Sequence, residues 1–266
     1  MQPVETGALT IAYRRDGVGA PLVLVHGAAE DSRIWAPQFA DLTDEFTVVA
    51  WDEPGAGSSS DLPDDFGLAD IADGLAALLE TLDLGPAHIA GISWGGTVLL
   101  ELYRRHPAHV ATLIMIDTYA GWKGSLPAAE VRARVASTRK MASVQGEAFD
   151  PTLPGLFADK PPAEFVPLLA AIAADVRPDT LRNELAIMAQ TDLSDLLPRI
   201  AVPTLLIWGQ HDARSPLSVA HQFNKAIPNS TLVVIDDAGH LSHLERPEQV
   251  NQAVREFCRA HPSDSG

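Results

Sequence analysis

The sequence predicts an α/β fold: a doubly wound, mostly parallel sheet of eight strands, with a helical lid inserted after the sixth strand. Short apolar runs, typical of strands buried on both faces, alternate with segments of helical periodicity. Between residue 118 and about residue 197 the strand pattern stops, prolines cluster and only helical patterns remain. A chain of 266 residues is long enough for one large domain with such an insertion. The predicted core domain therefore comprises residues 1–117 and 198–266, and residues 118–197 form the predicted cap.

The individual elements follow from local patterns. Residues 9–13 and the segment before them are expected to form a hairpin, and the run PLVLV at residues 21–25 is typical of a buried strand. Regularly spaced leucines predict a helix over 68–82, which Gly85-Pro86 ends. The same reasoning predicts further helices over 32–42, from the turn after residue 93 up to 105, near 128–145, 162–174 and 179–190, and over 249–260. It predicts further strands over 46–51, 88–92, 113–116, 204–208 and 231–235.

One serine stands between a predicted strand and a predicted helix. The apolar run at 88–92 ends in the segment GISWGG at 91–96, and helical spacing begins at once. Such a strand, sharp turn and helix would place Ser93 at the apex with its hydroxyl pointing out of the sheet. Gly91 and Gly95 suit this geometry, because strand and helix almost touch there. A serine in an ordinary glycine-rich turn is the alternative, but this context favours a nucleophile.

A serine hydroxyl is a weak nucleophile at neutral pH and needs a base within hydrogen-bond reach. Histidine suits that role, and a carboxylate must hold its tautomer and stabilise the imidazolium. Ser93, Asp212 and His240 supply all three groups, each on a loop after a predicted strand. Since the carboxyl ends of parallel strands meet at one edge of the sheet, the three side chains are expected to lie together.

Four further histidines compete with His240 for the role of base: His26, His88, His211 and His243. The base is expected after the last strand of this topology, which favours His240. We expect His26 to support a loop, His88 to be an ordinary strand residue, His211 to point away, and His243 to lie behind the site or at the surface.

The acid is less firmly determined, because Asp117 also follows a strand beyond Ser93. The order of the three groups along the chain favours Asp212. In that case Asp117 should cap its strand near the entry to the cap, without contacting His240. The backbone N–H groups of Ala28 and Trp94 are the predicted oxyanion donors, because both follow the ends of predicted strands.

These motifs resemble those of the α/β-hydrolase fold family, in particular its serine esterase and enol-lactonase group. The matching segments are HG at 26–27, GISWGG at 91–96, GQHD at 209–212 and GH at 239–240, in the family's order. The resemblance implies hydrolysis of an ester or lactone through an acyl-enzyme, without a cofactor. One departure concerns Glu53, since an Arg-Gly pair often follows the aspartate of that loop in the family.

The cap offers apolar side chains that could contact a substrate: Trp122, Phe149, Phe157, Phe165 and Met188. Its cations, among them Arg134, have the spacing of exposed helix positions. Apolar pockets with few polar groups suit short acyl or lactone ligands. We therefore expect a small, partly apolar substrate.

Composition excludes several classes of partner. The formal net charge of −16 disfavours nucleic acid and anionic membranes. The single cysteine, Cys258, permits no intramolecular disulfide and is expected in the core, and no metal site is expected from the spacing of Cys and His. Without a signal-like N-terminus or a long apolar run, a cytoplasmic protein is the default expectation. Nothing in the sequence predicts the oligomeric state.

Besides cofactor-free oxygenation, which the resemblance also leaves open as an outlier, two other functions fit the same motifs. One is a C–C bond hydrolase that uses the same three side chains. The other is a binding protein on this fold that holds its ligand without turnover, because a fold does not by itself establish an activity.

Overall fold

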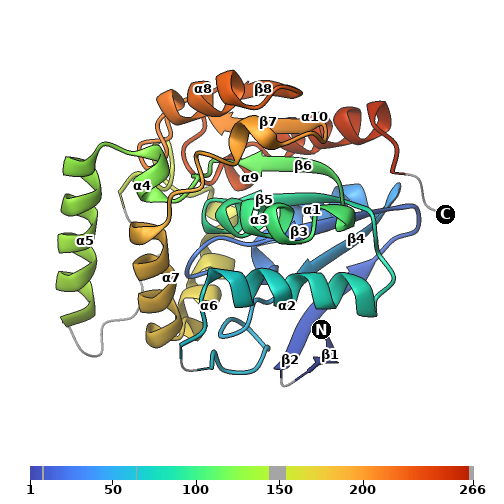
Figure 1. Ribbon diagram of the computed structural model, residues 1–266, viewed down its shortest axis with the longest axis horizontal. Coiled ribbons are helices and arrows are strands. Elements are labelled where there is room, and N and C mark those ends of the chain that lie inside the picture. Colours follow the sequence, from blue (N-terminus) through green and yellow to red (C-terminus); the bar gives the residue numbers. More distant parts are fainter. Residues whose placement is uncertain (8, 64, 144–153, 264–266) are drawn as a thin grey trace.

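The computed structural model describes residues 1–7, 9–63, 65–143 and 154–263. Eight strands form one sheet in the order β1-β2-β4-β3-β5-β6-β7-β8 (Figure 1). The strands are β1 (Gln2–Thr6), β2 (Leu9–Asp16), β3 (Ala20–Val25), β4 (Phe46–Trp51), β5 (Ala87–Ile92), β6 (Val110–Ile116), β7 (Thr204–Gly209) and β8 (Ser230–Ile235). β1 and β2 form the expected hairpin, β2 is antiparallel to β4, and every other pair is parallel. The predicted α/β fold with its mostly parallel sheet is confirmed.

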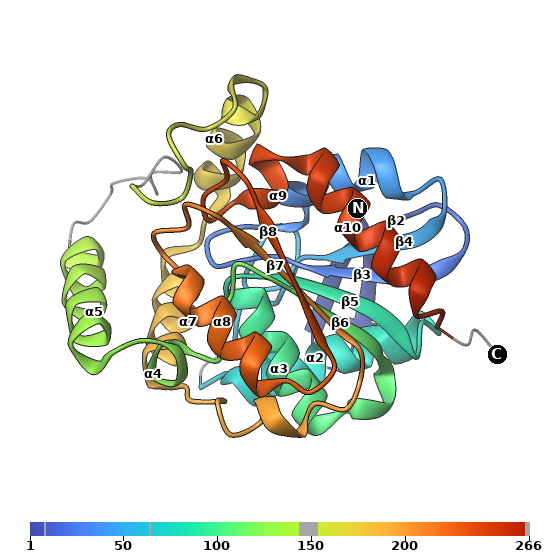
Figure 2. The same ribbon diagram turned by 90° about the horizontal axis from the view of Figure 1, so that it is seen from above.

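Helices cover both faces of the sheet because alternate residues of each central strand are apolar on opposite sides. In β6, Leu113 and Met115 belong to one core cluster, whereas Ile114 and Ile116 belong to the other. The first cluster is covered by α2 (Leu68–Thr81), α3 (Trp94–Arg105) and α8 (Leu217–Ala226), and the second by α1 (Ala36–Leu42) and α10 (Pro247–Ala260) (Figure 2). Cys258 lies buried in the second cluster.

The helical insertion follows β6, as the sequence predicts. It contains α4 (Trp122–Ser125), α5 (Ala128–Ser143), the short 3₁₀ turn η3 (Ala163–Phe165), α6 (Val166–Asp175) and α7 (Pro178–Gln190). Figure 1 shows α5 and α7 side by side, beyond the carboxyl ends of the central strands. The remaining turns and short helices are η1 (Ser32–Trp35), η2 (Pro107–His109), η4 (Leu197–Arg199) and α9 (Ser242–Glu245).

The helix predicted over 32–42 consists of two parts, the 3₁₀ turn η1 and then α1. The side chain of Asp31 caps the turn by accepting a hydrogen bond from the Arg33 N–H. Pro37 occupies the first turn of α1, where a missing N–H costs no helical hydrogen bond. The turn η1 and the helix α1 together fix the end of the loop that follows β3, which comprises residues 26–31.

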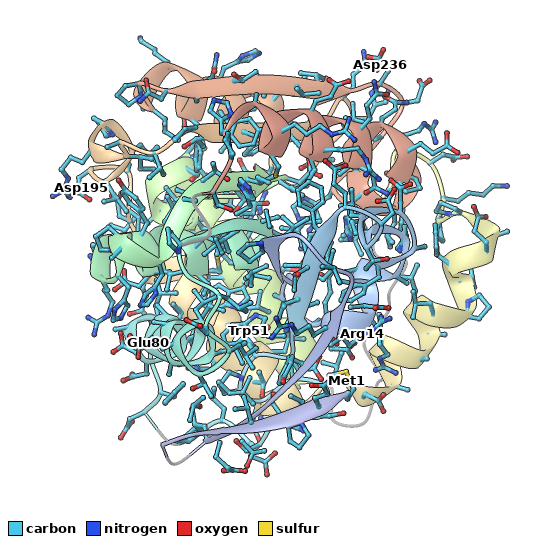
Figure 3. All side chains as sticks on the ribbon, turned by 90° about the vertical axis from the view of Figure 1, so that its right-hand side faces the viewer. Met1, Arg14, Trp51, Glu80, Asp195 and Asp236 are labelled. Carbon is cyan, nitrogen blue, oxygen red and sulfur yellow. The ribbon has the colours of Figure 1, made fainter. Side chains whose placement is uncertain are left out.

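Several acidic side chains lie at the surface of the molecule. Figure 3 shows Glu80, Asp195 and Asp236 pointing outward, while Trp51 lies inside. Among the helices of the described residues, none has the length and hydropathy needed to cross a membrane.

Candidate active site

Ser93 occupies a strained turn between β5 and α3. Its backbone has φ +50° and ψ −115°, a conformation that few residues other than glycine adopt. A Cβ atom at Gly91 would lie 2.8 Å from the Gly95 carbonyl carbon, and one at Gly95 would lie 2.4 Å from the Val25 carbonyl oxygen. Glycine at both positions lets α3 pack this closely against β5 and against the end of β3.

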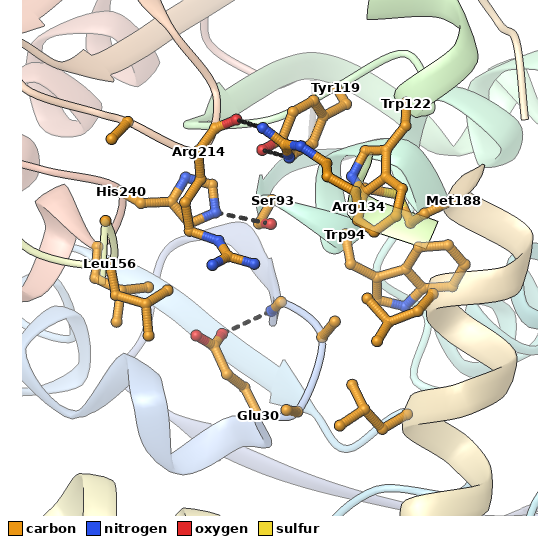
Figure 4. Close-up of a pocket in the computed structure, with 18 of the residues that line it drawn as sticks. Glu30, Ser93, Trp94, Tyr119, Trp122, Arg134, Leu156, Met188, Arg214 and His240 are labelled. Atoms are coloured by element: carbon orange, nitrogen blue, oxygen red, sulfur yellow. Dashed lines mark hydrogen bonds between the residues drawn. The ribbon is translucent and has the colours of Figure 1, made fainter. Parts of the chain in front are cut away.

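The structure brings Ser93, His240 and Asp212 together in one chain of hydrogen bonds (Figure 4). His240 Nε2 lies 3.0 Å from Ser93 Oγ, and His240 Nδ1 lies 2.8 Å from Asp212 Oδ2. Asp212 follows β7 and His240 follows β8, so both loops leave the sheet at the edge where Ser93 lies. Asp212 Oδ1 accepts the backbone N–H groups of Arg214 and Ser215, each at 2.8 Å. These contacts hold the carboxylate in the orientation that His240 requires.

Asp117 directly follows β6, at the point where the helical insertion begins. It is fully buried, and its two oxygens accept hydrogen bonds from the Gly209 N–H and the Ser242 hydroxyl. Asp117 thus caps the end of β6, as expected, and these contacts hold it beneath the loops that carry Asp212 and His240. Burial and the nearby charge of Asp212 raise the pKa of Asp117 well above its ordinary value. Among the described residues, no hydrogen bond joins Asp117 to His240.

The loop after β3 lies beside Ser93, where Gly27, Ala28 and Trp94 line the same cavity as the serine. Trp94 is the first residue of α3, so its N–H belongs to the turn that has no acceptor within the helix. His26 supports the loop from inside the protein. Its Nδ1 lies 2.8 Å from the Gly27 carbonyl oxygen and therefore carries the proton, while its Nε2 accepts the Glu53 N–H at 3.1 Å.

Three glutamates lie in or beside this loop, and the sequence analysis pointed to only one of them, Glu53. Glu30 accepts the Gly27 N–H at 2.7 Å, and Glu184, from α7, accepts the Ala29 N–H at 3.3 Å. Glu53, at the position where the family often has arginine, accepts the Trp94 indole N–H at 2.8 Å.

Burial alters the protonation of these glutamates. It raises the pKa of Glu30 to about 7 and also raises the pKa of Glu53. Burial, reinforced by the nearby Glu53, raises the pKa of Glu184 well above its ordinary value. The unusual residue at position 53 was the only sequence signal for this cluster, because Glu30 and Glu184 are far apart in the chain.

The remaining histidines lie away from Ser93 Oγ. His243, expected behind the site or at the surface, is completely buried, and its ring packs 4.8 Å from the ring of Trp35. Burial lowers the pKa of His243 to about 3 and that of His88 to about 4, so both stay neutral at physiological pH. His88 pairs with Thr112 on the neighbouring strand, and His211 is exposed.

A cavity of about 520 Å³ opens beside Ser93 and His240 (Figure 4). Trp122 and Met188 line it, as expected for two of the cap residues. Further apolar lining comes from Leu156, Leu181 and Leu185. Burial of a ligand in such a cavity would depend mainly on apolar contact.

Three other cap expectations differ from the structure or lie outside it. Phe157 is buried but does not line the cavity, because its side chain belongs to the second core cluster. Phe165 packs at the edge of the same cluster. Phe149 lies outside the described residues.

Arg134 was expected on an exposed helix face, and that expectation is wrong. It lines the cavity and donates hydrogen bonds to the Tyr119 hydroxyl, the Glu130 carboxylate and the Arg214 carbonyl oxygen. Its guanidinium also lies over the Tyr119 and Trp122 rings, at 5.6 and 5.5 Å from their centroids. The apolar pattern of α5 is too weak to show which side of the helix faces the core.

The described residues contain no cluster of three or more histidine, cysteine or acidic side chains arranged to hold a metal ion. The groups positioned around Ser93 are a base with its acid partner, backbone N–H groups and an apolar cavity. Such a set can activate a hydroxyl for attack on an acyl carbon and stabilise the oxyanion that forms.

The chain is similar to known proteins over most of its length. A model of the Alpha/beta hydrolase family matches residues 22–253. A thermophilic esterase from Thermogutta terrifontis, solved with malate bound, is 32% identical, with a TM-score of 0.84 and coverage of 98% of this chain and 100% of that chain.

Two relatives are similar in sequence. The Pseudomonas syringae protein named "Putative carbamate hydrolase RutD" is 32% identical over 259 residues, which cover 91% of this chain and 94% of that protein. The dihydrolipoyllysine-residue acetyltransferase component of the acetoin cleaving system of Pseudomonas putida is 32% identical over 252 residues. That match covers 91% of this chain but only 64% of the longer relative.

Proposed function

The chain belongs to the alpha/beta hydrolase family, and from this premise we propose that it is a serine hydrolase that cleaves a small, partly apolar ester or lactone through an acyl-enzyme. The observation that carries the proposal is the hydrogen-bond chain from Asp212 through His240 to Ser93 at the wall of the cavity. The similarity to an esterase and to a protein named as a carbamate hydrolase supports acyl-group chemistry.

In the first step, His240 Nε2 takes the proton from Ser93 Oγ as that oxygen attacks the carbonyl carbon of the substrate. The carbonyl oxygen becomes an oxyanion, and the N–H groups of Ala28 and Trp94 donate hydrogen bonds to it. Asp212 accepts a hydrogen bond from Nδ1 and stabilises the imidazolium. In this role its two backbone donors keep the carboxylate from turning away from the ring.

The tetrahedral intermediate then collapses. The bond from the acyl carbon to the leaving oxygen breaks, and His240 gives its proton to that oxygen, which leaves the acyl group on Ser93. A water molecule enters, loses a proton to His240 Nε2 and attacks the same carbon. The second collapse returns the proton to Ser93 Oγ and releases the acid. No step needs a cofactor.

A fluorophosphonate probe tests the activated serine directly. We expect the intact protein to gain the mass of one phosphonyl adduct, and Ser93→Ala to gain none. A protein that binds its ligand without turnover would leave the probe unreacted. Adduct formation at Ser93 combined with no activity on any ester or lactone would instead favour the C–C bond hydrolase.

A substrate series then defines the reaction. We expect turnover of p-nitrophenyl esters with short acyl chains, or of simple lactones, and a loss on the order of 10³-fold or more in Ser93→Ala. Ser93→Ala with normal thermal stability and most of the activity would overturn the proposal.

A further inference from the structure

A second cation lies in the cavity beside Ser93. Arg214 lines it, and Figure 4 shows its guanidinium in the cavity near Ser93, His240 and Glu30. Within the described part of the chain, the guanidinium makes no hydrogen bond or ion pair, although the backbone of Arg214 does. Arg134, the other arginine of the cavity, is by contrast tied to Tyr119 and Glu130.

The backbone of Arg214 is held from two sides. Its N–H donates to Asp212 Oδ1 at 2.8 Å, and its carbonyl oxygen accepts a hydrogen bond from Arg134 Nη2 at 2.5 Å. The neighbouring Ser215 N–H also donates to Asp212. The loop is therefore positioned by main-chain contacts, and the Arg214 side chain is not needed to hold it. The guanidinium of Arg214 is therefore available to bind a ligand.

The cavity itself supplies little negative charge to balance this guanidinium. Glu30 is the only acidic residue among the residues that line the cavity in the described part of the chain. Its Oε2 already accepts the Gly27 N–H, and burial raises the pKa of Glu30 to about 7. Near neutral pH much of Glu30 is therefore uncharged. A half-buried guanidinium is stable in such a place when a ligand provides the anion.

We propose that Arg214 binds a carboxylate of the substrate, so that this protein prefers esters or lactones that carry one carboxylate close to the scissile bond. The inference rests on the proposed function, which it narrows to a class of substrate. A guanidinium presents two parallel N–H groups that match a carboxylate. The apolar side chains Trp122, Leu185 and Met188 would contact the uncharged remainder.

The test compares acid and amide pairs of esters. On the alcohol side the pair is 4-acetoxybenzoate and 4-acetoxybenzamide, and on the acyl side it is monoethyl succinate and ethyl succinamate. Within each pair only the charge of one group changes. We expect the carboxylate member of at least one pair to have a kcat/KM higher by on the order of 10- to 100-fold. The pair that shows the preference identifies which side of the ester Arg214 contacts.

Arg214→Met should reduce that acid-to-amide ratio to near one, because methionine keeps an unbranched chain but removes the charge. Arg132→Met is the matched control, since Arg132 is an exposed arginine of α5 that does not line the cavity. It should leave the ratio unchanged. Absence of a preference in both pairs, or an equal preference in Arg214→Met, would overturn the inference.

Measurements of ligand binding in a variant that cannot turn over substrate test the carboxylate site independently of the proposed function. In Ser93→Ala, calorimetric titration should show tighter binding of 4-acetoxybenzoate, or of monoethyl succinate, than of the matching amide. Addition of Arg214→Met should remove that difference. Wild-type protein that hydrolyses no ester and no lactone, while these binding differences hold, would overturn the proposed function but support the carboxylate site. Esters that are hydrolysed without any difference in binding or in rate would overturn the site alone.

Discussion

The carboxyl group of Asp212 and those of three glutamates lie near Ser93, and the two sets have different surroundings. Asp212 accepts three hydrogen bonds, from the Arg214 N–H, the Ser215 N–H and His240 Nδ1. Glu30, Glu53 and Glu184 accept fewer hydrogen bonds than Asp212. Glu30 and Glu184 each accept one backbone N–H, whereas Glu53 accepts the Trp94 indole N–H and a hydrogen bond from the neutral Glu184 carboxyl.

The difference teaches that carboxyl groups close to one serine can be suited to different roles. Nearby N–H donors favour the ionised form, whereas removal from water favours the protonated form. Burial prevails at the glutamates and raises the pKa of all three. These carboxyls fix the backbone at residues 27–29 and the Trp94 ring, whereas the proposed chemistry needs a charge at Asp212. Replacement of a carboxyl by its amide should therefore have very different consequences in the two groups.

The largest effect is expected for Asp212→Asn. The amide keeps the shape but removes the charge that stabilises the protonated His240, and it favours the wrong tautomer of the ring. We expect kcat to fall by on the order of 10⁴-fold, with the melting temperature nearly unchanged. Steady-state kinetics on a p-nitrophenyl ester measure this. A variant that keeps a tenth of the wild-type rate would remove Asp212 from the proposed mechanism.

The second effect concerns stability and Glu30. The folded protein binds this proton more tightly than the unfolded chain, since the pKa rises from 4.5 to about 7. Its contribution to the free energy of unfolding is thus complete below pH 4.5 and is lost as the pH rises through about 7. Between pH 5 and pH 8, wild type should lose about 2 kcal/mol more than Glu30→Gln. Urea unfolding at several pH values measures this, and parallel curves for the two proteins would contradict it.

Asp117→Asn should have a smaller effect, less than about 10-fold in kcat/KM. Burial and the nearby Asp212 charge raise the pKa of Asp117, so an uncharged amide resembles its native state. The amide can keep hydrogen bonds to the Gly209 N–H and the Ser242 hydroxyl. Steady-state kinetics of Asp117→Asn and Asp212→Asn on the same ester show which replacement reduces the rate more. An inactive Asp117→Asn combined with an active Asp212→Asn would move the acid to the loop after β6.

The smallest effect is expected for Glu184→Gln. The pKa of Glu184 is raised well above its ordinary value, and a glutamine oxygen can accept the Ala29 N–H in its place. We expect kcat/KM within about 3-fold of wild type, because the hydrogen bond between the cap and the oxyanion loop is kept. Glu184→Ala is the comparison that removes this bond and should cost more. If Glu184→Gln proved as damaging as Asp212→Asn, the distinction between the two groups of carboxyls would fail.

The sequence by itself determined the sheet, the position of the insertion and the residues that could meet at one edge. Apolar runs such as 21–25 specify strands buried on both faces, and parallel strands bring their carboxyl ends to a common edge. The glycines around Ser93 specify the sharp turn, since no larger residue fits there. These features are local or follow from topology, so the order of residues along the chain is sufficient to predict them.

Tertiary structure alone decided how the cavity is lined and charged. Arg134 and Arg214 come from separate segments, and only the packing of α5 brings the first against the backbone of the second. The same holds for Glu184, which reaches the Ala29 N–H from α7, more than 150 residues away. From the sequence, Phe157 was expected to line the substrate cavity, but its side chain packs in the core. Burial, and with it the pKa of a carboxyl, depends on every neighbour in space, whereas a sequence pattern reports only neighbours along the chain.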